Sequence, residues 1–214
     1  MANFFLDHER LIKGAEELGL SLSADQLAKL DQYASILYKW NKTYNLTSIE
    51  DKDSVLNLHI LDSLASVPVF NEYLSCGSRL LDVGSGGGLP GIPLAIMFPN
   101  CNITLVDTVG KKTAFLTQVA LNLKLNNVQV IHNRVEKLNR LKYDVITSRA
   151  FSSLDNFVFL TRHLISANGH WIALKGQYPE EELVNLASDI KYHIIDINVP
   201  FLNQNRTIAI LSNR

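Results

Sequence analysis

Hydrophobic and polar positions follow a helical rhythm in the first third of the chain. One helix face is defined by the i, i+3, i+4 spacing of Leu27, Leu30, Ala34, Leu37 and Asn41, with Tyr33 and Trp40 broadening it. Ser23 and Gln26 fit a capping box at its start, because each side chain can pair with the backbone N–H of the other residue. A second, shorter helix is predicted over residues 53–64. We therefore expect residues 1–75 to form an N-terminal helical cap subdomain.

From residue 79 onward the pattern changes to short apolar runs that alternate with longer amphipathic segments. Strands are predicted over residues 79–83, 103–107, 128–131, 144–148 and 170–174, and helices over residues 90–98, 111–124, 154–165 and 179–188. This alternation indicates a parallel sheet with right-handed crossovers. Two further strands, 192–199 and 206–211, are too close for a crossover helix and should pair antiparallel. Residues 76–214 are thus expected to form one α/β domain with a seven-stranded, mostly parallel sheet and an antiparallel C-terminal hairpin.

A glycine-rich loop follows the first predicted strand. Five glycines fall within eight positions, at Gly84, Gly86, Gly87, Gly88 and Gly91. A loop of this kind between a strand and a helix brings bare backbone close to a bound molecule, and the helix N-terminus directs unpaired N–H groups toward it. The loop therefore predicts a nucleotide-like ligand at the carboxyl edge of the sheet.

The glycines can be aligned in two registers, and each indicates a different ligand. Residues 86–91 match the G-x-G-x-x-G pattern of dinucleotide folds, which would make the chain an NAD-dependent oxidoreductase. The other register begins with Asp82 inside the strand and continues through Gly84, Gly86 and Gly88. A carboxylate there suits the positive sulfonium of S-adenosylmethionine. We favour the second register, because the second half of the chain lacks an evident Tyr/Lys or His/Asp set for hydride transfer.

Two further segments at the same sheet edge bear on the cofactor. Asp107 ends the second predicted strand, 23 residues after Gly84, where an acid can accept hydrogen bonds from both ribose hydroxyls of an adenosine. Asp at a strand end is also common as a turn residue or helix cap. Val135 and Glu136 follow the third strand and could frame an adenine, although Glu136 fits equally well as a carboxylate at a helix start.

Composition and charge narrow the class of protein. The chain has 214 residues, 47% of them hydrophobic and 19% charged, with a formal net charge of -1. No apolar run approaches the ~20 residues of a membrane span, and the first ten residues lack a signal-peptide core, so we expect a cytoplasmic protein. Cys76 and Cys101 are too few for a disulfide framework and are not spaced as a zinc site, so no metal is expected.

Positive charge is concentrated in one part of the sequence. Residues 111–149 contain eight basic and two acidic residues: Lys111, Lys112, Lys124, Arg134, Lys137, Arg140, Lys142 and Arg149 against Glu136 and Asp144. Such a segment can form a phosphate-facing patch, and it can equally consist of solvated helix faces and loops.

Several segments together resemble one family. They are residues 82–93, 39–48, 59–63, 148–151 and 173–177, which cover motifs along nearly the whole chain. The chain is similar to the RsmG (GidB) family of bacterial 16S ribosomal RNA 7-methylguanosine methyltransferases. The resemblance implies a Rossmann-like class I S-adenosylmethionine-dependent methyltransferase. It also implies that 16S ribosomal RNA or the small subunit is the partner and that guanine 527, in RNA numbering, is the target. A monomer is favoured.

The resemblance also implies which residues meet the cofactor. In addition to Asp82 and Gly86 of the loop, these are Gly84, Leu89, Val135, Glu136 and Arg149, with Asp107 at the ribose. One departure is Gly87, where proline is expected in some relatives, and glycine there loosens the loop.

The chemistry of the sequence is compatible with guanine N7 as the target. N7 carries an in-plane lone pair and no proton, so direct in-line attack on the methyl group needs no general base. Cys76 and Cys101 precede strands and should lie at the opposite edge of the sheet from the ligand, which argues against a cysteine nucleophile. Residues 148–151 do not match the Asn/Asp-Pro-Pro-aromatic tetrad of amine methyltransferases. Another RNA site, a small molecule or a protein stays open as the substrate.

Four residues are candidates for contact with the substrate. Asn45 and His59 lie in the helical cap, which could fold over the cleft, although an isolated histidine is more often structural. Phe151 could stack on the guanine, but core packing is the more common role for an aromatic side chain. Lys175 follows the fifth strand at the ligand edge, where it could contact a phosphate. Arg149 is interpreted as a cofactor or phosphate contact and not as an acid catalyst.

Overall fold

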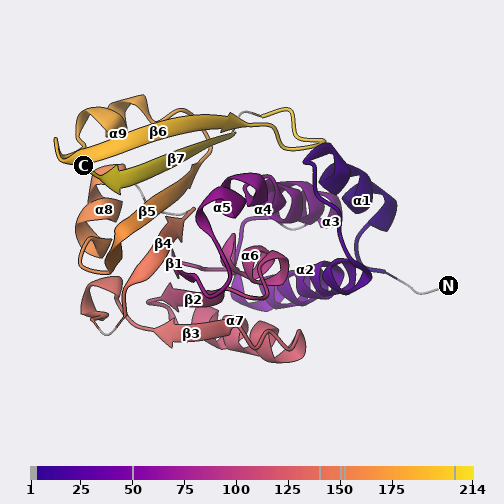
Figure 1. Cartoon of the computed structure of the whole chain (residues 1–214). Helices are drawn as coiled ribbons and strands as arrows, with labels where there is room; N and C mark the ends of the chain where they lie inside the picture. Colours follow the sequence, from indigo (N-terminus) through magenta and orange to yellow (C-terminus); the bar gives the residue numbers. More distant parts are fainter. Residues whose placement is uncertain (1–3, 50, 140, 150, 152, 205) are drawn as a thin grey trace.

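A single twisted sheet organises the chain. The computed structural model describes residues 4–49, 51–139, 141–149, 151, 153–204 and 206–214, and the sheet order within them is β3-β2-β1-β4-β5-β7-β6 (Figure 1). The strands are β1 (Arg79–Val83), β2 (Asn102–Asp107), β3 (Val128–His132), β4 (Tyr143–Ser148), β5 (Ile165–Lys175), β6 (Ile190–Ile197) and β7 (Arg206–Asn213). Strands β1 to β5 pair in parallel, whereas β7 pairs antiparallel with both β5 and β6. The predicted seven-stranded sheet with its C-terminal hairpin is confirmed.

The residues before β1 are helical, as the sequence predicts. The elements are α1 (His8–Glu17), α2 (Ala24–Tyr44), α3 (Lys52–Val55), the π-helix η1 (Leu56–Leu61), α4 (Asp62–Leu64) and α5 (Val67–Tyr73). The capping box is present: Ser23 Oγ accepts from the Gln26 N–H at 3.2 Å, and Gln26 Oε1 accepts from the Ser23 N–H at 2.9 Å. The helix predicted over residues 53–64 is observed as the run from α3 to α4, but its π-helical middle was not predicted.

The remaining helical segments connect the strands. They are α6 (Gly91–Met97), α7 (Gly110–Asn122), the 3-10 turn η2 (Val135–Lys137), α8 (Leu154–Thr161) and α9 (Glu180–Val184). The predicted helix over residues 154–165 is wrong at its C-terminal end, because the chain re-enters the sheet early. The Tyr143 N–H bonds the Leu164 carbonyl at 2.8 Å, and the buried Thr161 hydroxyl accepts the Trp171 indole N–H at 2.8 Å. The strand predicted over residues 170–174 starts too late for the same reason, since β5 begins at Ile165. The other predicted boundaries differ from the observed ones by about one helical turn or less.

Neighbouring side chains of each strand enter two hydrophobic cores, one on each face of the sheet. In β1, Leu80 belongs to the core shared with α2, α6 and α7, whereas Leu81 belongs to the core shared with α8. This alternation is the two-residue period of an extended strand. Leu37 of α2 and Phe115 of α7 lie in the same core, so the N-terminal helices pack directly on the rest of the fold. The division into subdomains at residue 75 stays a prediction.

In the described part of the chain, no helix is long and apolar enough to cross a membrane.

Helix α6 approaches β1 and β2 closely at its first residue. A Cβ placed on Gly91 would lie 2.3 Å from Leu105 Cδ2 and 2.5 Å from Asp82 Oδ2, both far inside normal van der Waals contact. The glycine therefore lets the end of β1 and the start of α6 meet, which sets the position of the loop between them.

We expect Gly91→Ala to lower the free energy of unfolding by about 1–3 kcal/mol, because overpacking a close core contact costs this much. Gly110→Ala is the matched control, since Gly110 also begins a helix but an added Cβ there would meet His132 at an ordinary 3.5 Å. Chemical denaturation measures both variants. Equal stability of the two would contradict the close approach at Gly91.

Candidate functional site

The glycine-rich loop adopts the left-handed conformation that favours glycine. Gly84, Gly86 and Gly88 have φ values of 69°, 56° and 88°. At Gly84 an added Cβ would find no atom within 4 Å, so this backbone borders open space. The Gly86 N–H donates to Asp107 Oδ2 at 2.9 Å, which ties the loop to the end of β2. The loop is thus held in shape while its first glycine stays accessible.

Beside this loop lies a cavity of about 300 Å³, here called the β1–β3 cavity. Its lining comes mostly from the carboxyl ends of β1, β2 and β3 and the residues that follow them, with Phe151 after β4 and Leu160 on α8: Val83, Gly84, Val106, Asp107, Thr108, Val109, Lys112, Asn133, Val135, Glu136, Phe151 and Leu160. Four residues predicted to contact the cofactor, Gly84, Asp107, Val135 and Glu136, are therefore brought together. The Asp107 carboxylate also accepts from the Val109 N–H at 2.9 Å, so its orientation is fixed.

Asp82, Gly86 and Leu89 are not among the residues that line this cavity. Asp82 is completely buried, and its Oδ2 accepts from the Gly91 N–H at 3.2 Å. Its Oδ1 has no hydrogen-bond partner among the described residues. Burial raises the pKa of this carboxyl from 3.8 to about 7, a shift that hydrogen bonds and the Arg149 charge only partly offset. Leu89 is buried in the core under the N-terminal helices.

Helix α2 supports the glycine-rich loop from below. The Tyr33 hydroxyl is buried and donates to the Gly87 carbonyl at 2.6 Å, and burial raises the pKa of this phenol. An added Cβ at Gly87 would lie 3.3 Å from Leu37 of the same helix. Sequence analysis placed Tyr33 on the apolar face but could not supply its polar partner, which is 54 residues away.

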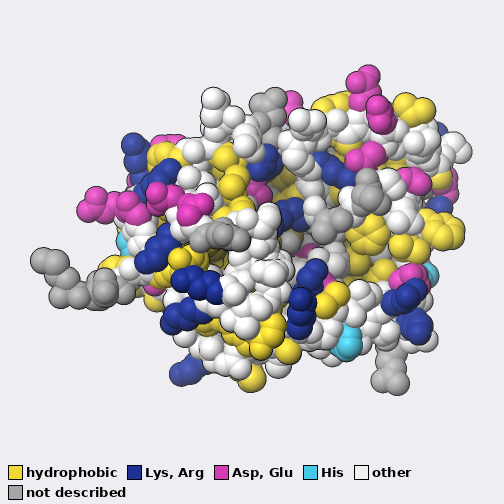
Figure 2. Space-filling model, turned by 180° about the vertical axis from the view of Figure 1, so that it is seen from behind, with side chains coloured by type: hydrophobic (Ala, Val, Ile, Leu, Met, Phe, Trp, Pro, Cys, Tyr) yellow, Lys and Arg dark blue, Asp and Glu magenta, His cyan; other side chains and the backbone are white. Residues whose placement is uncertain are grey.

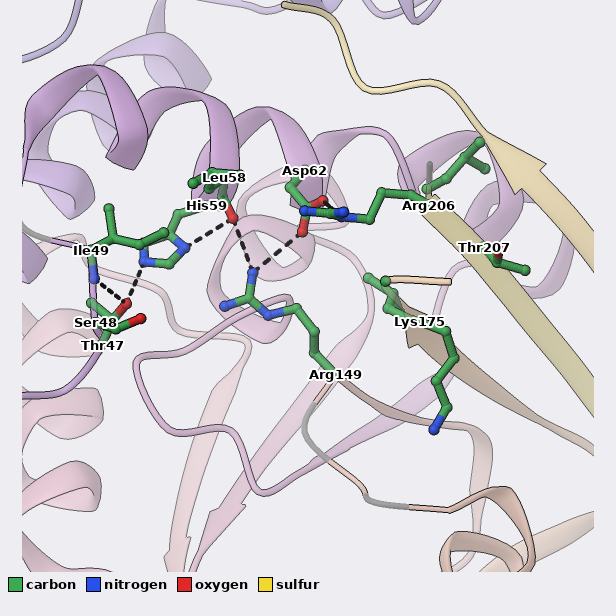
Figure 3. Close-up of a pocket in the computed structure, with 13 residues that line it drawn as sticks. Thr47, Ser48, Ile49, Leu58, His59, Asp62, Arg149, Lys175, Arg206 and Thr207 are labelled. Atoms are coloured by element: carbon green, nitrogen blue, oxygen red, sulfur yellow. Dashed lines mark hydrogen bonds and ion pairs between the residues drawn. The ribbon is translucent and has the colours of Figure 1, made fainter. Parts of the chain in front are cut away.

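A second cavity, of about 340 Å³ and here called the β4–β7 cavity, continues along the same sheet edge (Figure 3). It is lined by Thr47, Ser48, Ile49, Leu58, His59, Asp62, Arg149, Leu174, Lys175, Gly176, Ile197, Arg206 and Thr207. The linings of the two cavities meet where Lys175 Nζ, in the wall of the β4–β7 cavity, donates at 3.2 Å to the carbonyl of Phe151, which lines the β1–β3 cavity. Arg149 also lines the β4–β7 cavity and is two residues from Phe151 in the sequence. Ala150, between them, lies outside the described residues.

Asp62 is the hub of the polar contacts in the β4–β7 cavity. Its Oδ1 accepts from Arg206 Nε at 2.6 Å, and its Oδ2 lies 3.3 Å from an Arg149 guanidinium nitrogen (Figure 3). The Asp62 side chain is only 7% exposed. The same Arg149 nitrogen donates to the Leu58 carbonyl at 3.2 Å. Sequence analysis predicted Arg149 as a site residue but assigned no role to Asp62 or Arg206, whose contacts span 144 residues of sequence.

His59 is buried and both of its ring nitrogens are engaged. Nδ1 lies 2.9 Å from the Leu58 carbonyl, and Nε2 lies 2.9 Å from Thr47 Oγ1. Because a carbonyl only accepts, the proton is assigned to Nδ1, which leaves Nε2 to accept from the Thr47 hydroxyl. Burial, helped by the Arg149 charge, lowers the pKa of His59 from 6.5 to about 4. The imidazole is therefore neutral at physiological pH.

The other three candidates for substrate contact, Lys175, Phe151 and Asn45, lie in different surroundings. Lys175 lines the β4–β7 cavity, but its Nζ pairs with Glu182 Oε2 at 2.7 Å and donates to the Phe151 carbonyl at 3.2 Å. Phe151 is half-buried and packs on Phe157 at a centroid distance of 5.1 Å, while also lining the β1–β3 cavity. Asn45 is exposed and lines neither cavity; it ends α2 in the left-handed conformation at φ 50°. Its residue type is explained by that helix cap.

The basic residues of the 111–149 segment divide between two edges of the sheet. Lys111, Lys112, Arg134, Lys137 and Arg149 follow strand ends or begin α7, on the side of the cavities, whereas Lys124 and Lys142 lie before strands. Arg140 lies outside the described residues. Figure 2 shows Lys and Arg side chains in several separate groups on one face of the molecule, with Asp and Glu side chains among them. Only part of the predicted positive segment is therefore next to the site.

The sheet order and the cavities beyond the parallel strand ends define a Rossmann-like methyltransferase fold. A ribosomal protein L11 methylase from Lactobacillus delbrueckii subsp. bulgaricus superimposes with a TM-score of 0.57 at 12% identity, over 72% of this chain and 78% of that one. A coclaurine N-methyltransferase bound to N-methylheliamine and SAH gives a TM-score of 0.54 at 15% identity, over 88% and 72%. The predicted fold class is confirmed.

Sequence comparison identifies the family. The family model described as rRNA small subunit methyltransferase G (GidB) matches residues 26–209. The Ribosomal RNA small subunit methyltransferase G of Ectopseudomonas mendocina (strain ymp) is 50% identical over 205 residues, which are 95% of this chain and 94% of that protein. The chain belongs to the rRNA small subunit methyltransferase G family. This membership confirms the resemblance and sets aside the NAD-dependent oxidoreductase alternative.

The raised pKa of Asp82 predicts an unusual pH dependence of stability. The folded carboxyl keeps its proton up to about pH 7, whereas the unfolded one loses it near pH 3.8. The stability that this group contributes is therefore fully present below pH 3.8 and is lost as the pH rises to about 7. Asp82→Asn should remove this pH-dependent loss of stability. The difference in free energy of unfolding between the variant and the native protein should therefore shift in favour of the variant from about pH 5 to pH 8. Parallel pH profiles in urea denaturation would contradict the shift.

Proposed function

We propose that this protein transfers a methyl group from S-adenosylmethionine to N7 of a guanine in 16S ribosomal RNA. The target is guanine 527 in RNA numbering, as the family resemblance implies. The observation that carries the proposal is the pair of adjoining cavities at the carboxyl edge of the sheet. The β1–β3 cavity has accessible backbone at Gly84 and the fixed carboxylate of Asp107. The β4–β7 cavity contains His59 and Asp62, whose polar side-chain atoms are already hydrogen-bonded. We infer that the cofactor occupies the β1–β3 cavity and the guanine the β4–β7 cavity.

The residues of the β1–β3 cavity fit an adenosine-containing cofactor. The open space at Gly84 admits a ligand against bare backbone, which a Cβ would obstruct. Asp107 is oriented by two backbone N–H groups, and a carboxylate can accept further hydrogen bonds from ribose hydroxyls. Val135 and Glu136 begin η2 on the far wall, where they can border the adenine. When bound, S-adenosylmethionine supplies an electrophilic methyl group on a sulfonium.

The β4–β7 cavity suits a reaction that requires no proton transfer. His59 is neutral, and its two nitrogens are engaged by Thr47 and Leu58. Both Asp62 oxygens are paired with arginines. Neither group is poised to remove a proton, which agrees with guanine N7, an atom that has none to lose. The contribution of these residues is to position the base and exclude water.

The remaining assignments follow from this arrangement. Phe151, at the junction of the two cavities, can stack on the guanine, and Lys175 and Arg149 can meet a phosphate from the wall. Asn45 lies farther out on the cap and is the weakest of the predicted contacts. We expect the substrate to be 16S ribosomal RNA or the small subunit, and the protein to act as a cytoplasmic monomer.

Gly84→Val tests the cofactor cavity. We expect it to reduce S-adenosylmethionine binding by at least about 100-fold in calorimetry, because the new side chain fills the space at Gly84. Gly77→Val is the matched control: Gly77 has a similar φ of 85° and equally open surroundings, but it lies before β1, away from both cavities. A folded Gly84→Val protein that binds the cofactor as tightly as the Gly77→Val protein would refute the site.

The assigned atom is tested by mapping the product. Small ribosomal subunits from a strain that lacks this protein are incubated with the purified protein and S-adenosylmethionine, and their RNA is probed by N7-methylguanosine-specific cleavage. We expect one new cleavage at guanine 527, and none when the Gly84→Val protein is used. Transfer of methyl label to the RNA without any new cleavage would assign the reaction to another atom.

A further inference from the structure

Asp62 joins three parts of the fold at the wall of the β4–β7 cavity. It lies on α4, Arg149 directly follows β4, and Arg206 begins β7. Each carboxylate oxygen of Asp62 accepts a hydrogen bond from a different arginine, as Figure 3 shows. At Asp62 the π-helix also changes the backbone pairing, since its N–H donates to the Asn57 carbonyl, five residues back. The Leu58 carbonyl, which an α-helix would offer to Asp62, instead accepts from Arg149 and His59.

Charge is nearly balanced around this cavity only because of its acids. Among the described residues that line it, the charged side chains other than Lys175, which is paired with Glu182, are Asp62, Arg149 and Arg206. Asp196 lies just outside, where it accepts from the Thr207 hydroxyl at 3.2 Å. Arg149 is separated by only two positions of sequence from Phe151, which lines the β1–β3 cavity. Without Asp62, the Arg149 and Arg206 guanidinium groups would lose the carboxylate that lies between them in the wall of the β4–β7 cavity.

Such a wall would oppose the proposed reaction. The methyl donor carries a positive sulfonium, and guanine becomes cationic when N7 is methylated. Both charges must lie near the junction of the cavities, where the methyl group passes from one to the other. Uncompensated positive charge in a partly buried site repels another cation more strongly than it does in water. Arginine is nevertheless useful there for holding RNA phosphates.

We infer that Asp62 is a positioning residue that holds Arg149 and Arg206 in the cavity wall and offsets their charge, so that the site accepts a sulfonium beside two arginines. This inference rests on the proposed function. It requires that removal of the Asp62 charge affect a positively charged ligand more than a neutral one of nearly the same shape. S-adenosylmethionine and S-adenosylhomocysteine are such a pair, since the second lacks the methyl group and the positive charge on sulfur.

The test is calorimetric titration of the full chain with each of these two ligands. We expect Asp62→Asn to weaken S-adenosylmethionine relative to S-adenosylhomocysteine by roughly threefold to tenfold, the size of a single charge acting through a partly solvated site. Asp53→Asn is the matched control, because it removes the same charge from an 81% exposed side chain on the same helical run. The control should leave the affinity ratio unchanged.

Arg206→Gln provides the opposite perturbation and keeps the test decisive if Asp62→Asn does not fold. Removing a positive charge while Asp62 remains should shift the affinity ratio toward S-adenosylmethionine, and the double variant should return it close to the native value. Equal weakening of both ligands by Asp62→Asn would show a merely structural role and overturn the inference. An unchanged ratio in both single variants would overturn it too.

The native protein separates failure of this inference from failure of the proposed function. If the native chain binds neither ligand, the assignment of the cofactor cavity is wrong. If it binds both and the variants leave their ratio unchanged, the cofactor assignment stands and only the role of Asp62 is wrong.

Discussion

The contact between the end of β1 and the start of α6 is the constraint on which the site depends. Gly91 allows the Asp82 carboxylate and the helix backbone to meet, and its N–H donates to Asp82 Oδ2. This contact determines where the glycine-rich loop can run. Asp107 and Tyr33 then hold the loop from two sides, through Gly86 and Gly87. The β1–β3 cavity is therefore shaped by buried contacts around the loop, while the backbone at Gly84 borders open space.

The two cavities are built by different means. The β1–β3 cavity is lined mostly by residues at or just after the ends of the parallel strands β1, β2 and β3, so its position follows from the sheet and its crossovers. The β4–β7 cavity depends on side chains from distant parts of the chain, joined by Asp62 and by the carbonyl of Leu58. The proposed function places a cationic cofactor beside an anionic RNA, and the two walls differ accordingly. Asp107 and the N–H groups of the loop can meet the cofactor, and the arginines balanced by buried Asp62 can meet RNA phosphates.

Much of the fold could be predicted from local pattern. The period-2 alternation in β1, the capping box at Ser23 and the short 200–205 connection each report on neighbouring residues, and all three predictions agree with the structure. The predicted C-terminal end of α8 was wrong, because the contact that ends it joins Thr161 to Trp171, ten residues later. Helical periodicity does not report such a contact. The π-helical segment was not predicted either, since its residues keep an apolar pattern compatible with an ordinary helix.

The sequence by itself determined the class of protein and placed Gly84 and Asp107 at the carboxyl ends of two successive parallel strands, because local pattern fixes where each strand ends. Tertiary structure decided the rest of the site. Only the folded chain turns Asp82 inward toward Gly91, engages both nitrogens of His59, and places Asp62 between two arginines. The physical reason is that burial and charge pairing depend on which distant residues meet, and neither is written in the local pattern of hydrophobic and polar positions.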